Sequence, residues 1–353
     1  MTGPHKILFY YRFLGLGGVE SVLLNRIEAL KVAGLDAEYW YSDTYCADPA
    51  LVSDAPYVRM VAREQVAQAA LAGEFDRIVV LDNPFVLRQI LRTKSHARIF
   101  AETHVPLPWK MRQFYRDMDN PGVAAVIVPS PYNKERLIEE LGIASERITV
   151  VRNIVPVDAA LVQHTQPQAP QLLWVGRLEN EKGPDLFISL ARKLSESGID
   201  ARFIMVGNDP DYEGRVGELR EFAGGAALDI SFIPAVARAD MQKMYKDAAA
   251  SGGAYVCTSR FESAPMTILE AMACGCPVVA SNAGGIPLMI ENRVDGELYD
   301  TETLDDAVAC IRRVLSSSDH RSNMTAAARQ RVGRDHSASA TVAAFRNLFG
   351  CEA

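Results

Sequence analysis

The stretch Phe261–Asp300, FESAPMTILEAMACGCPVVASNAGGIPLMIENRVDGELYD, decides the fold. Pro265 suits the first position of a helix, and Gly275 suits the residue just past its end. The residues between them are apolar on nearly every side, which predicts a buried helix rather than an amphipathic surface helix. Pro277 prevents continuation of the helix, and the apolar run after it predicts a short buried strand over Val278–Ser281.

This predicted helix carries a carboxylate without a partner of its own. Glu270 has no Lys or Arg three or four positions away, so no ion pair within the helix neutralises it. A buried carboxylate is costly unless hydrogen-bond donors reach it. The donors could come from elsewhere in the fold or from a polyhydroxylated ligand. Glu262 is the second carboxylate of this otherwise apolar region.

The whole chain has the composition of a soluble globular enzyme. Its 353 residues exceed what one hydrophobic core usually supports, which favours two domains. A net charge of −7 argues against a generic nucleic-acid binder. No run approaches the about eighteen apolar residues of a membrane helix, and the N-terminus lacks the pattern of a signal peptide. The six cysteines show no zinc or C-x-x-C spacing, which favours packed, reduced thiols and a cytoplasmic protein.

Strand-like and helical segments alternate along the first half. Ile7–Tyr11 predicts a strand, Arg12–Gly18 predicts a turn, and a helix is expected from Val19. Further strand-like runs lie at Ala37–Tyr41, Arg77–Leu81, Arg98–Ala101 and Ala124–Val128. The alternation predicts a parallel sheet with helices on both faces.

The turn after the first strand is a candidate phosphate contact, because a glycine loop before a helix presents backbone N–H groups. Gly15 and Gly17 fit the dinucleotide fingerprint G-x-G-x-x-G, but its third glycine position is Glu20. The fingerprint therefore fails. The structural alternative is a tight turn in which Glu20 favours the start of the helix.

Two other features of the first half are open to more than one interpretation. His104 follows a predicted strand, where α/β proteins place their chemistry, but a lone histidine is often structural. The segment Arg88–Arg116 carries seven Lys or Arg residues against one acid, Glu102. It could contact an anionic acceptor or lipid head groups, or it could be a solvated face.

The second half restarts the alternation. Leu172–Val175 predicts a buried strand, Gly176–Gly183 the loop after it, and Pro184–Leu194 a helix. Arg177 stands at the strand end and Lys182 at the helix start, where the helix dipole disfavours a cation unless an anion is bound nearby. The structural alternative is that these cations pair with one of two neighbouring acids in the loop, Glu179 or Glu181.

The remaining predicted elements continue this pattern to the C-terminus. The expected strands are Ala201–Val206, Ile230–Ile233 and Ala254–Cys257, and the expected helices are Pro131–Leu141, Ala239–Ala248, Leu304–Leu315 and a last helix with the apolar stripe Val342, Phe345 and Phe349.

Several of these pieces together resemble the family 4 glycosyltransferases, retaining enzymes of the GT-B architecture. The matching motifs are Gly17-Gly18-Val19-Glu20, Glu102-Thr103-His104, VIVPSPYNKERL before Asn153, Gly176-Arg177-Leu178 with Lys182-Gly183, and Glu262-x7-Glu270 leading into LEAMACGCPVVAS and a Gly-Gly pair. They occur in the family order and span nearly the whole chain. Any one of them would be weak, but their joint order and spacing are specific.

The resemblance implies an α/β protein with the GT-B fold, in which two Rossmann-like, doubly wound domains face each other across a cleft. The acceptor-binding domain would be residues 1–156 and the linker 157–170. The nucleotide-sugar-binding domain would be 171–335, and the C-terminal helix in 336–353 would cross back to the first domain.

The resemblance also implies roles for individual residues. Arg177 and Lys182 would hold the donor diphosphate, Glu270 the ribose hydroxyls and Glu262 the hydroxyls of the transferred sugar. The implied donor-binding set is Gly17, Gly18, Arg177, Lys182, Glu262, Ala264, Met266, Thr267 and Glu270, and the implied catalytic set is Glu262, His104, Arg177 and Lys182. Many relatives have glycines after the first glutamate, whereas this chain has Ser263-Ala264-Pro265. Because Pro265 has no N–H to offer, the identity of the donor sugar stays open.

The implied reaction is retaining transfer of a hexose-type sugar from a nucleotide-diphosphate sugar, UDP favoured over GDP, to a hydroxyl of a polysaccharide, glycolipid or secondary metabolite. Fixed cations and helix N–H groups would stabilise the leaving diphosphate, with no metal and no cofactor. The expected location is the cytoplasm, with weak peripheral contact of Arg88–Arg116 at the inner face of a membrane. Alternatives on the same fold are a sugar-nucleotide epimerase and a non-catalytic sugar-nucleotide-binding protein. A Rossmann dehydrogenase would need the fingerprint that Glu20 interrupts.

Overall fold

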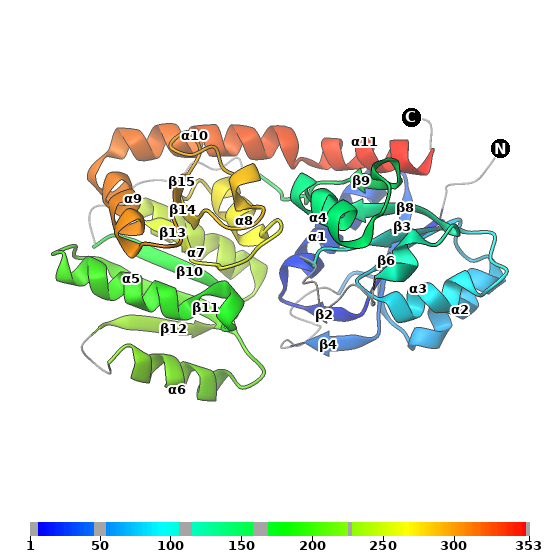
Figure 1. Cartoon of the computed structure of the whole chain (residues 1–353), viewed down its shortest axis with the longest axis horizontal. Helices are drawn as coiled ribbons and strands as arrows, with labels where there is room; N and C mark the ends of the chain where they lie inside the picture. Colours follow the sequence, from blue (N-terminus) through cyan, green and yellow to red (C-terminus); the bar gives the residue numbers. More distant parts are fainter. Residues whose placement is uncertain (1–5, 46–53, 106–114, 158–168, 225–227, 351–353) are drawn as a thin grey trace. The chain divides into compact units, whose positions relative to one another are not determined.

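The computed structural model describes residues 6–45, 54–105, 115–157, 169–224 and 228–350. The chain divides into two compact units (Figure 1). Unit 1 consists of Met1–Ile154 together with His336–Ala353, and unit 2 consists of Val155–Asp335. Most of the predicted linker, 158–168, lies outside the described residues.

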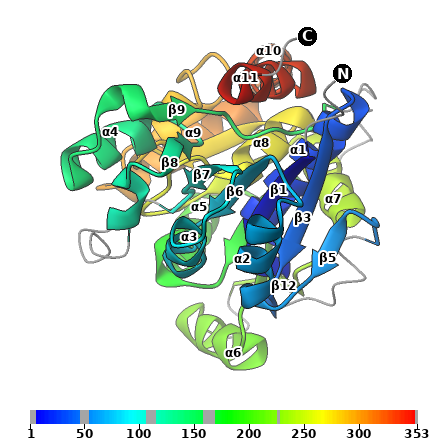
Figure 2. The same cartoon turned by 90° about the vertical axis from the view of Figure 1, so that its right-hand side faces the viewer.

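Unit 1 is built on a parallel sheet with the strand order β5-β3-β1-β6-β7-β8-β9, which Figure 2 displays. Its strands are β1 (Lys6–Tyr11), β3 (Asp36–Tyr41), β5 (Val58–Met60), β6 (Arg77–Leu81), β7 (Arg98–Glu102), β8 (Val123–Val128) and β9 (Ile148–Val150). The order reverses between β1 and β6, as in doubly wound α/β folds. The parallel sheet expected from the alternating sequence is confirmed.

Helices cover both faces of this sheet because successive strand residues point to opposite sides. The helices are α1 (Gly18–Val32), α2 (Arg63–Ala72), α3 (Pro84–Leu91), α4 (Pro131–Leu141) and α11 (Ala338–Phe349), with short 3-10 helices at Arg116–Asp119 and Ser145–Arg147. Ile7 and Phe9 pack with α1 and α11, whereas Leu8 and Tyr10 pack with α2, α3 and α4.

The C-terminal helix α11 is part of the core of unit 1. Phe345 and Phe349 are fully buried, and Phe349 stacks edge-on against Phe100 of β7 with 5.0 Å between ring centroids. Arg77 and Arg98 donate hydrogen bonds to the backbone oxygen of Phe349 over 2.8 and 3.1 Å. The end of α11 is thereby tied to the first residues of β6 and β7.

The turn predicted over Arg12–Gly18 is partly wrong. Within it, β2 (Phe13–Gly15) pairs in parallel with β4 (Asp43–Tyr45) and forms a separate two-stranded sheet. The pairing partner lies far away in the sequence, so the local pattern of a short glycine-bearing segment does not reveal the strand.

Unit 2 repeats the doubly wound arrangement with the strand order β12-β11-β10-β13-β14-β15. Its strands are β10 (Gln171–Arg177), β11 (Arg202–Asn208), β12 (Ile230–Pro234), β13 (Ala254–Cys257), β14 (Val278–Ser281) and β15 (Glu297–Tyr299). The order reverses between β10 and β13, which are hydrogen-bonded neighbours. The predicted strands of the second half are all present.

The helices of unit 2 also lie on both faces of its sheet. They are α5 (Pro184–Glu196), α6 (Tyr212–Phe222), α7 (Arg238–Ala250), α8 (Met266–Ala273), α9 (Leu304–Ser316) and α10 (Ser318–Asp335), with 3-10 helices at Asn180–Lys182 and Ile286–Leu288. Trp174 and Val256 pack in one core with α5, α6 and α9. On the other face, Tyr245 of α7 stacks edge-on against Tyr255 of β13.

The buried helix predicted in the opening stretch is confirmed, with one correction at its start. Pro265 is not the first helical residue but the residue before it, because its backbone is extended, with ψ at 124°. Gly275 has a φ of +70° and follows the helix end as expected. The residues after α9 carried no helix prediction, yet α10 forms there. Few of its residues are buried, namely Met324, Ala328 and Val332.

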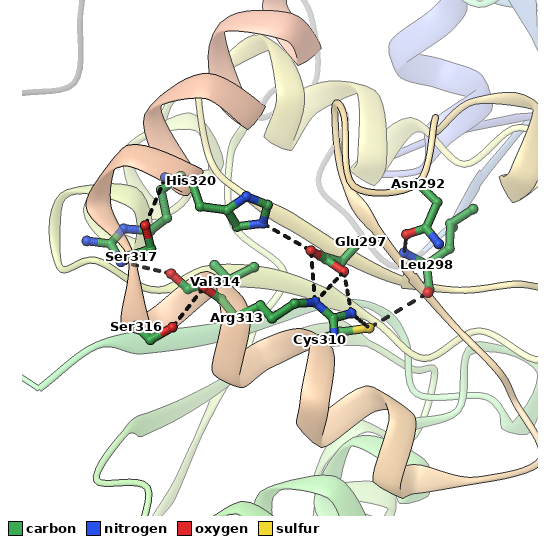
Figure 3. A network of polar contacts seen from close by, with 10 residues as sticks. Asn292, Glu297, Leu298, Cys310, Arg313, Val314, Ser316, Ser317 and His320 are labelled. Atoms are coloured by element: carbon green, nitrogen blue, oxygen red, sulfur yellow. Dashed lines mark hydrogen bonds and ion pairs between the residues drawn. The ribbon is translucent and has the colours of Figure 1, made fainter.

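A buried carboxylate joins β15 to α9 and α10 (Figure 3). Glu297 is fully buried and accepts hydrogen bonds from the Arg313 guanidinium, the shortest over 2.6 Å. His320 Nε2 lies 3.0 Å from the same carboxylate. Burial raises the pKa of Glu297, but Arg313 and His320 outweigh this, so it lies below its ordinary value. This network anchors the sheet edge to the helices beside it.

Candidate functional site

Two loops of unit 2 meet where its strand order reverses. One follows β10 and leads from Arg177 to Lys182; the other follows the neighbouring strand β13 and leads to Glu262. In open α/β sheets, ligands bind outside the carboxyl ends of the strands at such a switch point. The fold therefore brings these three predicted site residues to the position where chemistry is expected.

Lys182 and Glu262 contact each other directly. Lys182 Nζ lies 2.5 Å from Glu262 Oε1, and the two side chains are 23% and 11% exposed. Ser259 Oγ donates a second hydrogen bond to the same oxygen over 2.9 Å. The sequence implied separate contacts for these residues, to diphosphate and to sugar. Their pairing means that a ligand at this point would meet both charges at once.

Arg177 is paired with the neighbouring acid Glu179. Arg177 NH1 lies 2.7 Å from Glu179 Oε1, and the side chains are 43% and 37% exposed. This is one of the two ion pairs that the sequence offered as the structural alternative. Exposed pairs of this kind contribute at most about 1 kcal/mol, so an anion can compete for the guanidinium. The role of Arg177 in diphosphate binding stays a prediction.

Gly183 allows the two loops to approach closely. Its φ is +67°, and a Cβ built there would lie 2.1 Å from the backbone oxygen of Thr258. No side chain fits that space, because the obstacle is backbone rather than a flexible side chain. Thr258 Oγ1 donates to the Gly183 oxygen over 2.7 Å and accepts from Trp174 Nε1 over 3.0 Å. The start of α5 is thus fixed against the loop after β13.

The Gly-Gly pair downstream supports the backbone around Glu262. Gly284 has a φ of +56°, and a Cβ there would lie 2.1 Å from the Glu262 oxygen. Gly285 donates its N–H to that oxygen over 2.8 Å. The pair therefore acts on the site through the position of Glu262.

Helix α8 begins directly after this loop. With Pro265 ahead of the helix, the first helical N–H groups belong to Met266 and Thr267, two of the predicted backbone donors. The Thr267 hydroxyl accepts a hydrogen bond from the Tyr255 hydroxyl over 2.7 Å. Ala264, the third predicted donor, lies in the loop before the helix and is partly buried.

Glu270 sits on the same helix and is partly exposed. Burial raises its pKa to about 7, while Arg238 and Tyr245 on α7 act in the opposite direction. The fold therefore places a guanidinium and a phenol near this carboxylate, which is one of the two sources of partners that the sequence left open. Its predicted contact with ribose stays a prediction.

The predicted site residues Gly17, Gly18 and His104 belong to unit 1. Gly17 precedes α1, and Gly18 is its first residue. The Glu20 carboxylate folds back so far that a Cβ on Gly17 would lie 2.4 Å from Glu20 Oε2. Glu20 is in the first turn of α1, as the structural alternative for this loop proposed.

His104 is held in a buried polar cluster at the end of β7. Its Nε2 lies 2.6 Å from Glu102 Oε1, and Arg26 NH1 donates to both oxygens of Glu102 over 2.9 and 2.8 Å. Arg26 and Glu102 are fully buried. Burial raises the pKa of Glu102, but Arg26 and His104 outweigh it, so the pKa is lower than usual. The Glu102 carboxylate therefore accepts a hydrogen bond from His104 Nε2–H and fixes the ring.

Asp82, at the end of β6, belongs to this cluster and was missed by the sequence reasoning. It accepts hydrogen bonds from Thr103 Oγ1 over 2.6 Å and from the His104 backbone N–H over 3.2 Å. Its φ is +43°, and burial raises its pKa. The signal was available, because Asp82 directly follows the predicted strand Arg77–Leu81, and His104 follows another predicted strand by three residues.

The basic segment Arg88–Arg116 is not one continuous charged face. Arg88 pairs with Asp117 over 2.6 Å, and Arg98 reaches the end of α11. Residues 106–114 lie outside the described part of the chain. The contact of this segment with a membrane or an acceptor stays a prediction.

Neither a metal cluster nor a membrane helix is found in the described ranges. Within residues 6–350, apart from the undescribed gaps, no three His, Cys, Asp or Glu side chains gather as metal ligands. The helices described in the same ranges are too short or too polar to span a bilayer. Four cysteines of the described ranges are buried, namely Cys257, Cys274, Cys276 and Cys310.

Comparison with known proteins finds similarity in the second half of the chain. Residues 162–331 match the family model of the glycosyl transferases group 1. The match covers the loops after β10 and β13 and all of α8.

Among curated proteins, the chain is 32% identical over 169 residues to a sulfoquinovosyl transferase, SQD2, of Arabidopsis thaliana, covering 47% of this chain and 30% of that protein. It is 31% identical over 188 residues to a lipopolysaccharide 1,6-galactosyltransferase of Salmonella typhimurium, covering 52% of this chain and 50% of that protein. The chain thus spans half or less of the length of these relatives.

Among solved structures, HepE of Anabaena in complex with UDP and glucose has a TM-score of 0.80. The alignment covers 99% of this chain and 100% of that one at 19% identity. At 19% identity, the similarity shows only that the two chains share a fold. The chain has the GT-B fold with two Rossmann-like domains, as its resemblance to the glycosyltransferases implied.

Proposed function

We propose that this protein is a retaining glycosyltransferase that transfers a hexose-type sugar from a nucleotide-diphosphate sugar to an acceptor hydroxyl. The observation that carries the proposal is the contact between Lys182 and Glu262 at the switch point of unit 2. Lys182 would be the cation for the diphosphate, and the Glu262 carboxylate beside it would accept hydrogen bonds from sugar hydroxyls. The match of residues 162–331 to the glycosyl transferases group 1 supports the same reaction class.

The leaving diphosphate is the chemical difficulty of this reaction. Negative charge grows on it as its bond to the sugar breaks, so fixed positive groups lower the barrier most when they are already in place. In the proposal Arg177 and Lys182 exchange their carboxylate partners for the diphosphate, and the first N–H groups of α8 add to the positive potential. No metal or other cofactor is required.

The other site residues are proposed to bind either the transferred sugar or the nucleotide. Glu262 binds hydroxyls of the transferred sugar and Glu270 binds the ribose. Ala264, Met266 and Thr267 contribute backbone N–H groups. For three residues of unit 1, the roles implied by the resemblance stay predictions: phosphate contacts for Gly17 and Gly18, and a sugar contact for His104, whose ring is fixed by Glu102.

UDP is the favoured nucleotide, ahead of GDP. Support comes from the similar fold of HepE, whose structure holds UDP and glucose. The two curated relatives named above are a sulfoquinovosyl transferase and a lipopolysaccharide 1,6-galactosyltransferase. The proposed acceptor is a polysaccharide, a glycolipid or a secondary metabolite, met in the cytoplasm or, through Arg88–Arg116, at the inner face of a membrane.

A screen of UDP- and GDP-sugars for donor hydrolysis tests the proposal. We expect one donor to be hydrolysed by the unaltered protein, and Glu262→Gln to lower turnover while retaining nucleotide binding. NMR of the product with a suitable acceptor should give the same anomeric configuration as the donor. Nucleotide binding without hydrolysis or transfer of any donor would favour a non-catalytic binding protein, and a change of the sugar on its nucleotide would favour an epimerase.

A further inference from the structure

Arg260 lies in the loop that carries Glu262 and contacts the loop that carries Lys182. Its backbone N–H donates to the Glu181 oxygen over 2.8 Å. Its guanidinium donates to the Asn180 oxygen over 2.6 Å and to both carboxylate oxygens of Asp185, at 2.9 and 2.5 Å. One residue of the loop after β13 therefore contacts the other loop on both sides of Lys182.

The planar guanidinium suits this task. Arginine presents several N–H groups in a rigid fork, so a carboxylate and a carbonyl can be held in one fixed geometry. Asp185 lies in the first turn of α5, and Asn180 begins the 3-10 helix that ends at Lys182. The hydrogen bond to Asp185 raises the pKa of the Arg260 guanidinium. Burial raises the pKa of Asp185, but Arg260 outweighs this and lowers it, as expected for a strong charge-assisted pair.

A second tie runs in parallel and reaches the same segment. Thr258 Oγ1 contacts the Lys182 oxygen over 3.3 Å and the Gly183 oxygen over 2.7 Å, and this threonine is itself fixed by Trp174 in the core. The partly exposed Arg260 adds contacts on both sides of Lys182 to those of the buried threonine.

We propose that Arg260 is a positioning residue, which sets Lys182 against Glu262 so that diphosphate and sugar are bound in one geometry. It acts through Lys182 rather than on the substrate. The inference rests on the proposed function for its consequence in catalysis, but the placement of Lys182 itself can be measured without any ligand.

Such a role predicts a small effect on stability and a large one on activity. The side chains of Arg260 and Asp185 are 34% and 35% exposed, and pairs this exposed stabilise a fold only slightly. A reacting group displaced by about 1 Å can cost about 100-fold in rate. We therefore expect Arg260→Gln to lower kcat/KM at least about tenfold with only a slight loss of stability.

The first test is independent of any substrate. The coupling between Lys182→Gln and Glu262→Gln is measured from the unfolding free energy of unit 2, using hydrogen exchange of β10 and β13 amides. We expect a clear coupling in the unaltered background and less than half of it in the Arg260→Gln background. The matched control is Arg192→Gln, which also removes an exposed arginine that donates to a backbone carbonyl, that of Phe222. Equal coupling in all three backgrounds would overturn the proposal.

The second test uses UDP-glucose hydrolysis as the probe. The effects of Lys182→Gln and Arg260→Gln on kcat/KM should not multiply, because a Lys182 that is already displaced contributes little to catalysis. The double variant should be close to Lys182→Gln alone, and Arg192→Gln should match the unaltered protein. If the double variant lost the full product of the two single losses in kcat/KM, positioning through Lys182 would be contradicted. An unaltered protein that neither hydrolyses UDP-glucose nor binds UDP would count against the proposed function, and the coupling measurement would then decide on Arg260.

Discussion

Arg177 and Lys182 are each paired with a carboxylate in unit 2, so the cationic character predicted for this site is largely neutralised within the protein. The two pairs differ in burial: Arg177–Glu179 is exposed, and Lys182–Glu262 is mostly shielded from solvent. A diphosphate must compete with both acids. Replacing either of the two acids should therefore change nucleotide binding, and the two changes should differ.

Glu179→Gln should strengthen nucleotide binding, because it releases Arg177 for the diphosphate. An exposed pair is worth at most about 1 kcal/mol, so the expected gain in UDP affinity is about two- to fivefold. Calorimetric titration measures it. The control Glu181→Gln removes the same charge nearby without touching the Arg177 pair. Equal gains in both variants would assign the effect to net charge instead.

Glu270 should make the stability of unit 2 depend on pH. Because burial raises its pKa from 4.5 to about 7, the folded protein keeps this proton longer than the unfolded chain does. The contribution is present below pH 4.5 and is lost as pH rises from about 4.5 to 7. We compare the unfolding free energy of Glu270→Gln with that of the unaltered protein. This difference should be roughly 1–2 kcal/mol more favourable to the variant at pH 8 than at pH 5, after discounting for partial exposure.

Urea unfolding at the two pH values measures this difference. Glu221→Gln, an exposed glutamate on α6, is the control and should keep the slope of the unaltered protein. A Glu270→Gln variant with the same pH slope as this control would contradict a protonated Glu270 in the folded state.

Among the elements, the loop after β10 depends on Gly183. Comparison of Gly183 with Gly198 separates the cost of a left-handed backbone from the cost of a clash with neighbouring backbone. Gly183 and Gly198 share a left-handed φ, +67° and +73°, but only at Gly183 would the Cβ of an alanine meet neighbouring backbone. Gly198→Ala should cost about 1 kcal/mol of unfolding free energy from strain alone. Gly183→Ala should cost more and should also weaken UDP binding about tenfold or more, because Lys182 is next to it in the chain.

The measurements are urea unfolding and UDP titration on both variants. Equal stability losses would mean that the contact between Gly183 and Thr258 imposes no extra constraint. Unchanged UDP affinity in Gly183→Ala would separate the start of α5 from the binding site.

Most elements could be predicted from the sequence because their signals are local. The apolar strands and the helix between Pro265 and Gly275 follow from runs of a few residues. Strand β2 could not, because its pairing partner lies far along the chain. Helix α10 could not either, because its buried residues are too few to stand out in a polar segment. The role of Arg260 was equally invisible, since its contacts join two loops that only the sheet order brings together.

At the scale of the whole molecule, unit 1 is completed by the C-terminal segment of the chain. Deleting residues 336–353 would remove Phe345 and Phe349 from the core and leave Arg77 and Arg98 without the carbonyl they bind. We expect hydrogen-exchange protection to fall in β1 and β7 and to persist in β10 and β13. Deletion of the undescribed tail 351–353 alone is the control. Equal loss in both sheets would show that the units do not unfold separately.

We propose that the switch point of unit 2 binds the diphosphate of a nucleotide sugar. Calorimetric titration of UDP and of GDP into the unaltered protein, Arg177→Ala and Arg192→Ala tests it most directly. We expect at least one nucleotide to bind. Arg177→Ala should weaken its binding about tenfold or more, because a charge-assisted contact is lost, and Arg192→Ala should leave its binding unchanged. Binding of UDP and GDP that is the same in all three proteins, or absent from the unaltered one, would contradict it.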